Sequence, residues 1–481
     1  MYKLNQDKIP LLEAMKNYAL KEVTSFDVPG HKRGVGTPIL NEYFGEKIMS
    51  IDTNSLPILD HIGKPTGVIK EAQDLLADAF NADEAFFVSN GSTAAIQMML
   101  MSVLSPGEKV LMPKNIHKSA LNGLILAGGI PIYLSPEVCD KEGLVKNVTV
   151  AEVKRCLDEF PEAKVVFLLN PTYFGYVGQL REIIKLCKQR NVLTIVDEAH
   201  GAHFNFHKDL PPSAMECGAD MSAVSIHKTG GALTQASVLL VKKDRIDLNR
   251  VKQVVNILQS TSVSYLLMGS LDGARYNLVK NGKEMLENAI RLCLMARNAI
   301  NEIPGLSTAF EADKFDPTKL VINTSNLTLT GFEVYELLWQ QYNIQLELCE
   351  TDHVLAIVSL GDTQGNIDKL IDALKNVAKK YLCTKTEEKL ILDPLISSTT
   401  VCMSPRDAYY SKSKMVEIDK AAGYVSAESI MAYPPGIPII SPGELITAPI
   451  VRILKDLKAK NAFIVDNKDP ELQYISVVVK E

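Results

Sequence analysis

The sequence predicts an α/β fold whose central sheet is mostly parallel and covered by helices on both faces. Between about residues 80 and 240, short apolar runs alternate with longer segments of helical period. The runs are apolar almost throughout, which is typical of strands that are buried on both faces. Ligands of such sheets bind at the carboxyl ends of the strands, so the residues that follow each run are candidates for a site.

The elements can be placed in chain order. A first strand at 85–90 runs into a predicted helix at 91–104, and a helix is expected again at 180–191. A long helix at 281–303 leads toward a second unit of mixed strands and helix. The segment 433–444 is expected to be a rigid loop because it is rich in proline and glycine. Further strands are predicted at 109–113, 128–134, 164–170, 192–200 and 221–228.

These elements suggest four parts of the chain, without repeats or low-complexity linkers. We expect an N-terminal arm at 1–60, a large domain at 61–280, a small α/β domain at 281–385 and a C-terminal domain at 386–481. The arm is set apart by its glycines and prolines, as in FDVPGHKRGVGTP.

Composition excludes several classes of protein. Of the 481 residues, 46% are hydrophobic, and the formal net charge is −6 without a long run of either sign. This argues against a nucleic-acid or membrane-surface binder, which needs a positive face. The eight cysteines form no CxxC pair, so we expect reduced thiols rather than a zinc ribbon or disulfides. With neither a signal peptide nor an apolar run of about 18 residues, the sequence predicts a cytoplasmic protein.

The first candidate site segment is SNGST at 89–93, where a strand passes into a helix. Gly91, Ser92 and Thr93 would offer backbone N–H groups, two hydroxyls and the positive end of a helix to a phosphate. The same residue types also form ordinary helix caps. Both interpretations stay open on this segment alone.

Asp197 is the second candidate because it follows four apolar strand residues. A carboxylate in that position needs a partner that offsets its desolvation, such as a metal ion, an arginine or a protonated ring nitrogen. Glu198 is expected to alternate to the other face and to be an accessory or structural residue. Ala199 is small enough for a flat ring to lie against it.

Lys228 and His117 complete the candidates at the strand ends. Lys228 follows SAVSIH, a strand that is expected to be buried, and precedes TGGA, whose glycines permit a ligand to approach closely. A desolvated lysine can lose its proton and act as a nucleophile that forms an imine. His117 follows the strand at 109–113 and is either a surface or capping residue or one that stacks on an aromatic cofactor or shuttles protons.

Together, a phosphate cradle, an acid for a ring nitrogen, a small residue beneath the ring and an imine-forming lysine describe a pyridoxal phosphate site. Two look-alikes are set aside. The DEAH segment at 197–200 lacks the upstream GxxxxGK[ST] loop of a helicase. The spacing of His200, His203 and His207 invites a metal site but offers no clear further ligands. We therefore predict no metal.

The segment AVSIHKTGGALTQAS at 223–237 resembles the signature of the prokaryotic ornithine/lysine/arginine decarboxylases. Further matches are PGHKRG, LDHIGKPTGVIKEAQ, SNGST, NIHKSA, DEAH, STSVSYLLMGSLD and YPPGIPIISPGE, so the resemblance covers nearly the whole chain. It implies pyridoxal phosphate fold type I, the aspartate-aminotransferase fold, with a mostly parallel seven-stranded sheet and smaller α/β C-terminal domains. Because the chain starts directly at the arm, the resemblance is to the short form without an N-terminal wing domain.

The resemblance also implies roles for residues. Lys228 would carry the Schiff base, Asp197 would pair with the pyridine nitrogen, and His117 would stack on the ring opposite Ala199. His200 departs from the larger members, which have tryptophan there, whereas α-oxoamine synthases have a histidine near the phenolic oxygen. Such enzymes work as homodimers, or larger assemblies of dimers, with shared active sites. The remaining cofactor contacts would be Gly91, Ser92, Thr93, Ser225 and His227, with Thr261 reaching the phosphate of a neighbouring subunit.

The implied reaction is decarboxylation of a basic amino acid in polyamine biosynthesis, with arginine ranked before lysine and ornithine third. Glu428, Asp60 or Asp52 are weak candidates for holding the distal cation of the substrate. The alternative is another enzyme of this fold, an aminotransferase or an α-oxoamine synthase. Aminotransferases of this fold usually hold the substrate carboxylate with an arginine of the small domain, and residues 310–380 contain none. A non-enzymatic relative would be expected to lose Lys228 or Asp197, and both are present.

Overall fold

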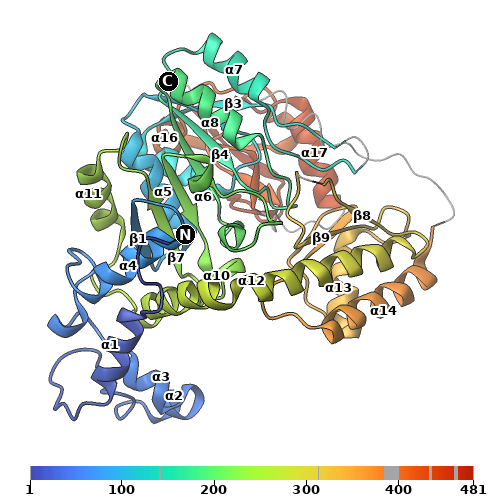
Figure 1. Cartoon of the computed structure of the whole chain (residues 1–481). Coiled ribbons are helices and arrows are strands. Elements are labelled where there is room, and N and C mark those ends of the chain that lie inside the picture. The colour runs from blue at the N-terminus through green and yellow to red at the C-terminus, as the bar shows by residue number, and fades with distance from the viewer. Residues whose placement is uncertain are drawn as a thin grey trace. The chain divides into compact units, whose positions relative to one another are not determined.

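The structure is a computed structural model that describes residues 2–139, 142–312, 314–383, 400–432, 436–459 and 464–479 (Figure 1). The chain forms two compact units, each built from two stretches of sequence. The first unit comprises Met1–Val103 and Ile195–Glu284, and the second comprises Leu104–Thr194 and Met285–Glu481. The four domain ranges expected from the sequence stay predictions.

Seven strands form the large sheet in the order β1-β7-β6-β5-β4-β2-β3. β2 pairs in parallel with β3 and β4, and β5 pairs in parallel with β6, whereas β7 is antiparallel to β1 and β6. The predicted mostly parallel sheet is therefore confirmed, with the antiparallel β7 as an addition. Its strands are β1 (Glu84–Val88), β2 (Lys109–Pro113), β3 (Ile130–Leu134), β4 (Val165–Leu169), β5 (Leu193–Asp197), β6 (Met221–Val224) and β7 (Ser237–Val241).

The helices match the predicted ones closely where the helical period is clear. α5 spans Gly91–Val103 and α8 spans Leu180–Gln189. The helix expected at 281–303 is longer and begins at Tyr265, so α12 (Tyr265–Asn301) has 37 residues. The other helices near the large sheet are α4 (Val68–Ala79), α6 (Lys118–Ala127), α7 (Val150–Glu159), α9 (Ala214–Cys217), α10 (Ile226–Thr229) and α11 (Leu248–Leu258). None of the helices in the described ranges is long and apolar enough to cross a membrane.

The second unit contains three further sheets. A four-stranded sheet in the order β10-β11-β9-β8 shares an apolar core with the end of α12 and with two later helices, α13 and α14. The expected loop at 433–444 lies partly outside the described residues, at 433–435, and contains a strand, β14 (Ile437–Ile440). Pairing with β13 buries the apolar run of β14, which outweighs the proline within it, Pro438. The further elements of the second unit are β8 (Ser307–Ala309), β9 (Lys319–Asn323), α13 (Gly331–Tyr342), β10 (Leu348–Cys349), β11 (His353–Ile357), α14 (Gln364–Tyr381), α16 (Pro405–Tyr410), β12 (Ser413–Glu417), β13 (Ile430–Ala432), α17 (Ala448–Ala459), β15 (Ile464–Val465) and β16 (Tyr474–Val478).

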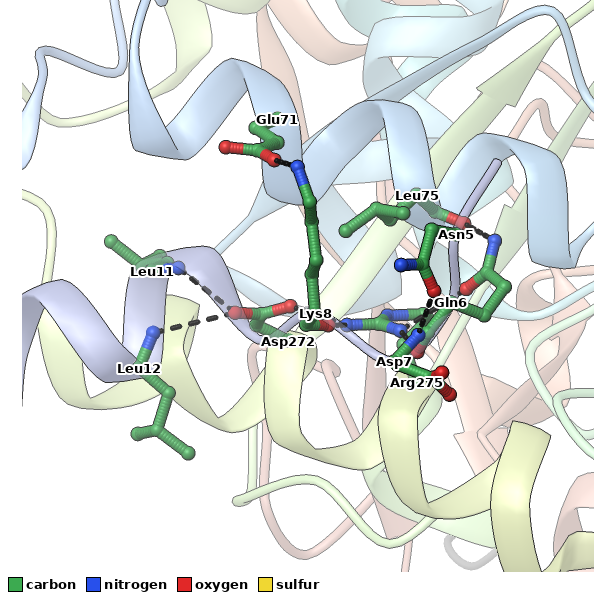
Figure 2. A network of polar contacts seen from close by, with 10 residues as sticks. All are labelled: Asn5, Gln6, Asp7, Lys8, Leu11, Leu12, Glu71, Leu75, Asp272 and Arg275. Carbon is green, nitrogen blue, oxygen red and sulfur yellow. Dashed lines mark hydrogen bonds and ion pairs between the residues drawn. The ribbon is translucent and has the colours of Figure 1, made fainter. Parts of the chain in front are cut away.

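The N-terminal arm carries three helices, α1 (Pro10–Ala19), α2 (Pro38–Phe44) and α3 (Glu46–Ile51). The side chain of Ile9, the residue before α1, does not cap that helix. The first N–H groups of α1 therefore need other acceptors. Asp272 of α12 supplies them, because its Oδ2 accepts hydrogen bonds from the backbone N–H of Leu11 at 3.0 Å and Leu12 at 3.3 Å (Figure 2).

Arg275 holds the preceding residues of the arm. Its guanidinium donates to the backbone carbonyl of Gln6 at 2.8 Å, to the carbonyl of Lys8 and to Asp272 Oδ1 at 2.9 Å (Figure 2). The side chains of Arg275 and Asp272 are both fully buried. The glycines of α12 allow the arm to come close, since a Cβ on Gly269 would lie 2.8 Å from Met15 Sδ. The arm is thus anchored by a buried ion pair of α12.

We expect Asp272→Ala to destabilise the protein by about 3–5 kcal/mol, because it leaves the Arg275 guanidinium buried without its carboxylate. Glu71→Ala is the matched control, since it removes an ion pair with Lys8 in which both side chains are largely exposed. Thermal unfolding followed by circular dichroism should show a lower midpoint for Asp272→Ala and little change for the control. Equal midpoints for both variants would contradict the anchoring role.

Candidate active site

The candidate site of the first unit is built on the parallel pair of β5 and β6. Asp197 is the last residue of β5 and lies in register with Ala223 of β6. The sequence predicted a strand through Lys228, but β6 ends at Val224 and the chain turns into the short helix α10. Gly230 is required there, because a Cβ at this position would lie 2.9 Å from the Ile226 carbonyl oxygen. Lys228 is therefore held on one helical turn just beyond the strand end.

Lys228 and Asp197 are close enough to interact electrostatically. The Asp197 side chain is buried, and this burial raises its pKa more than the Ala199 N–H, at 3.0 Å from Oδ1, and the positive charge of Lys228 lower it. A buried carboxylate of this kind is stabilised by a partner that shares a proton with it. The same arrangement places the Lys228 Nζ 3.0 Å from His200 Nε2.

The neighbouring polar residues have other partners. Glu198 is buried and accepts hydrogen bonds from the Ala214 N–H at 2.7 Å and from the Ser222 hydroxyl at 3.1 Å, which is a structural role. The ring of His203 lies 3.0 Å from the Thr229 hydroxyl, and His207 Nδ1 accepts from the backbone N–H two residues later. In the part of the chain that the structure describes, no group of three His, Cys, Asp or Glu is arranged to hold a metal ion.

The predicted phosphate contacts also lie in the first unit. Gly91 has a positive φ of 73° and begins α5, a helix of 13 residues that packs on β6 and β7. Ser92 and Thr93 lie in its first turn, where backbone N–H groups need acceptors. Ser225 follows β6 and is the N-cap residue of α10, and its hydroxyl is buried without a hydrogen-bond partner. A buried hydroxyl of this kind suits an anion that brings its own oxygen atoms.

Two further candidates complete this group. His227 Nδ1 lies 3.1 Å from the Ala236 carbonyl oxygen, so its ring is held against the start of β7. Thr261 lies exposed in the segment between α11 and α12, as its predicted contact with another subunit requires.

Of the three predicted acceptors of the substrate cation, Asp60 and Glu428 accept hydrogen bonds from backbone N–H groups, and their contact with substrate stays a prediction. Asp60 accepts hydrogen bonds from Thr66, Gly67 and other N–H groups that precede and begin α4. Burial alone would raise its pKa, but these bonds together hold the pKa below its ordinary value. Asp52 lies 3.1 Å from the His31 ring. In the second unit, Glu428 accepts from the N–H of Lys468 and Ser476, both at 2.6 Å.

His117 belongs to the second unit and caps α6. Its Nδ1 accepts from the Ser119 N–H at 3.2 Å, and its ring lies 6.5 Å from the Tyr173 ring, measured between centroids. The structure thus gives His117 the capping role that was one of its two interpretations. Stacking on a cofactor stays a prediction.

Lys114 is a residue that the sequence reasoning missed. It forms a buried ion pair with Glu444, 330 positions away, and its Nζ lies 4.5 Å from the centre of the Tyr133 ring. Burial lowers the pKa of Lys114 despite the carboxylate. Lys114 follows β2 directly, so the rule that identified Asp197 and Lys228 from strand ends could have found it. Nothing local identifies Glu444 as its partner.

Comparison with known proteins adds independent evidence. Residues 9–312 match the family model described as Orn/Lys/Arg decarboxylase, major domain, and residues 389–465 match the C-terminal domain of that family. The chain is 41% identical over 454 residues to an arginine decarboxylase of Halalkalibacterium halodurans, covering 92% of each. It is 38% identical over 489 residues to an arginine decarboxylase of Bacillus anthracis, covering 99% of each. The solved lysine decarboxylase A of Pseudomonas aeruginosa shares the fold, with a TM-score of 0.85 and 21% identity over 98% of this chain and 80% of that one.

Proposed function

The chain belongs to the Orn/Lys/Arg decarboxylase family, and we propose that it converts arginine to agmatine with pyridoxal 5'-phosphate as its cofactor. The observation that carries the proposal is the placement of Asp197 at the end of β5 and of Lys228 just beyond the paired strand β6, close enough to interact. The relatives with 38% and 41% identity bear the name arginine decarboxylase, which favours arginine. Lysine, giving cadaverine, is the second candidate, and ornithine is the third.

The residues of the first unit fit this cofactor. The Ser225 hydroxyl is buried without a partner, and the first turn of α5 offers N–H groups beside Ser92 and Thr93. Both features suit a phosphate. Asp197 is a buried acid that a protonated ring nitrogen would stabilise, and Lys228 offers an amine for the aldehyde. When bound, the cofactor supplies a ring that accepts the electron pair left behind by carbon dioxide.

The residues of the chain would divide the remaining work. Lys228 would hold the cofactor until the substrate amine replaces it, and Asp197 would keep a proton on the ring nitrogen. Ala199 is buried and small, so a flat ring could lie against it. His117 would cover the opposite face, and either Lys228 or a nearby histidine would return a proton to the α-carbon. Because residues 310–380 contain no arginine, a bidentate clamp from that segment would not hold the carboxylate that must leave.

Two further features of the proposed enzyme are the acceptor of the substrate cation and the oligomeric state. Asp60 and Glu428 are already engaged by backbone N–H groups, so we do not assign the guanidinium to either. A homodimer is supported by the arm, whose exposed apolar side chains need cover. These side chains include Phe26, Val28, Val35, Tyr43 and Phe44.

We expect the purified protein to release carbon dioxide from arginine faster than from lysine or ornithine, with agmatine as the product. The measurement is carbon dioxide release with each amino acid, followed by identification of the amine by mass spectrometry. Lysine as the best substrate would correct the substrate alone. Amino transfer to a keto acid without carbon dioxide would overturn the proposed reaction.

The role of Lys228 is tested in the same assay. Lys228→Ala should reduce carbon dioxide release to background and abolish the visible absorbance of the lysine-bound cofactor. Lys208→Ala, at an exposed lysine of the same unit, is the matched control and should behave as the wild type. Normal turnover by Lys228→Ala would refute the assigned role.

Ser225→Ala should weaken cofactor binding by about tenfold to a hundredfold, because a hydrogen bond to a charged group contributes about 1.5–3 kcal/mol. The thermal stability of the cofactor-free protein should hardly change, since the Ser225 hydroxyl has no partner to lose. Ser222→Ala is the contrast, because it removes the hydrogen bond to Glu198 and should lower stability. Titration with pyridoxal phosphate measures the affinity, and unchanged affinity in Ser225→Ala would exclude this phosphate contact.

A further inference from the structure

We propose that His200 is the base that removes a proton from the Lys228 ammonium group and so prepares the amine for capturing the cofactor. The inference rests on the proposed function, because it requires an aldehyde for the amine to capture. It assigns His200 a task in proton transfer, beyond contact with the cofactor ring.

The geometry meets the requirements for an activated nucleophile. His200 Nε2 lies 3.0 Å from Lys228 Nζ, within the range in which an amine donates a hydrogen bond to an imidazole. His200 lies three residues beyond β5, and Lys228 lies four residues beyond β6. Since these strands are paired in parallel, the two side chains are set by the register of the sheet. The contact therefore joins the turn that follows β5 to the short helix α10 that follows β6.

Lys228 needs such a base because only its neutral amine can attack an aldehyde. A lysine with its ordinary pKa of about 10.4 is neutral in roughly one molecule in two thousand at pH 7. Asp197 makes the problem greater, because its negative charge interacts with Lys228 and favours the ammonium form. His200 is buried, with 4% of its surface exposed, so bulk water is a poor substitute for it at this contact.

The other titratable groups around the pair have different hydrogen-bond partners. On the β5 side, Glu198 accepts from Ala214 and Ser222, and His203 contacts the Thr229 hydroxyl. On the α10 side, the His227 ring lies against the Ala236 carbonyl. Asp197 itself accepts from the Ala199 N–H. His200 is assigned as the acceptor of the Lys228 proton on its own contact, because its Nε2 lies 3.0 Å from the Lys228 Nζ.

The proposed step moves one proton from the Lys228 ammonium group to His200. One N–H bond of the ammonium group breaks, its electron pair stays on Lys228 Nζ, and the proton bonds to His200 Nε2. The neutral amine then attacks the aldehyde carbon of the cofactor. A carbon–nitrogen double bond replaces the carbon–oxygen double bond, and the oxygen leaves as water with the two protons that remained on nitrogen.

The test is the rate at which cofactor-free, full-length protein captures pyridoxal phosphate at a series of pH values, followed by visible absorbance. His200→Gln is the informative variant, because its amide oxygen accepts a hydrogen bond but not a proton. We expect capture to slow by about a hundredfold at neutral pH, a typical contribution of a general base. The deficit should shrink as the pH approaches the pKa of lysine, because solvent then deprotonates the amine.

His203→Gln is the matched control, since this buried histidine contacts the neighbour of Lys228 rather than Lys228 itself. It should keep the wild-type pH profile. A wild-type profile in His200→Gln would overturn the proposed base and leave the proposed function intact. Failure of the wild type to capture pyridoxal phosphate at any pH would instead overturn the proposed function.

A second measurement does not depend on the folding of a His200 variant. Nitrogen NMR of the histidine rings, in cofactor-free wild type and Lys228→Met, reports the titration of each imidazole. If His200 contacts the Lys228 amine, one histidine should titrate at a higher pH in Lys228→Met, because a neighbouring cation no longer opposes its protonation. Identical histidine titrations in both proteins would contradict the proposal.

Discussion

The parallel register of β5 and β6 is the constraint on which the candidate site depends. It brings the carboxyl ends of the two strands to one edge of the sheet, so that Asp197 lies in register with Ala223 and Lys228 follows one helical turn later. Burying a carboxylate there costs free energy, which is reflected in the raised pKa of Asp197. That cost is tolerated because the flanking strands are apolar and rigid, and it is offset when a proton-bearing partner binds.

Much of the large sheet could be predicted from the sequence, because buried parallel strands are apolar throughout and α5 and α8 have a clear helical period. The errors have local causes that only packing explains. Gly269 and Gly273 obscured the first half of α12, although they let the arm approach. Ile437 and its neighbours were expected in a loop because prolines flank and interrupt them, yet pairing with β13 makes them a strand. β6 ended early because the chain turns into α10.

Candidate site residues can be selected from the sequence where they lie at strand ends. They cannot be selected where their hydrogen-bond partners are backbone groups distant in the sequence. Lys228 and Asp197 could be selected from the sequence because strand ends of parallel sheets share one edge, whereas Ser225 was indicated by the family resemblance alone. Asp60 and Glu428 have the same chemistry as substrate-binding carboxylates, but turns and strands distant in sequence supply their N–H partners. The 3.0 Å contact of His200 with Lys228 likewise depends on how two strand ends pair.

The ion pair between Lys114 and Glu444 has a consequence for the folding of the protein during its translation. Lys114 is made early, whereas its carboxylate appears 330 residues later. Until then a cation beside β2 has nothing to neutralise it, and water must stay around it. The edge of the sheet near β2 can thus reach its native packing only after translation is almost complete. A nascent chain stalled before residue 444 would expose that unfinished edge to chaperones and proteases.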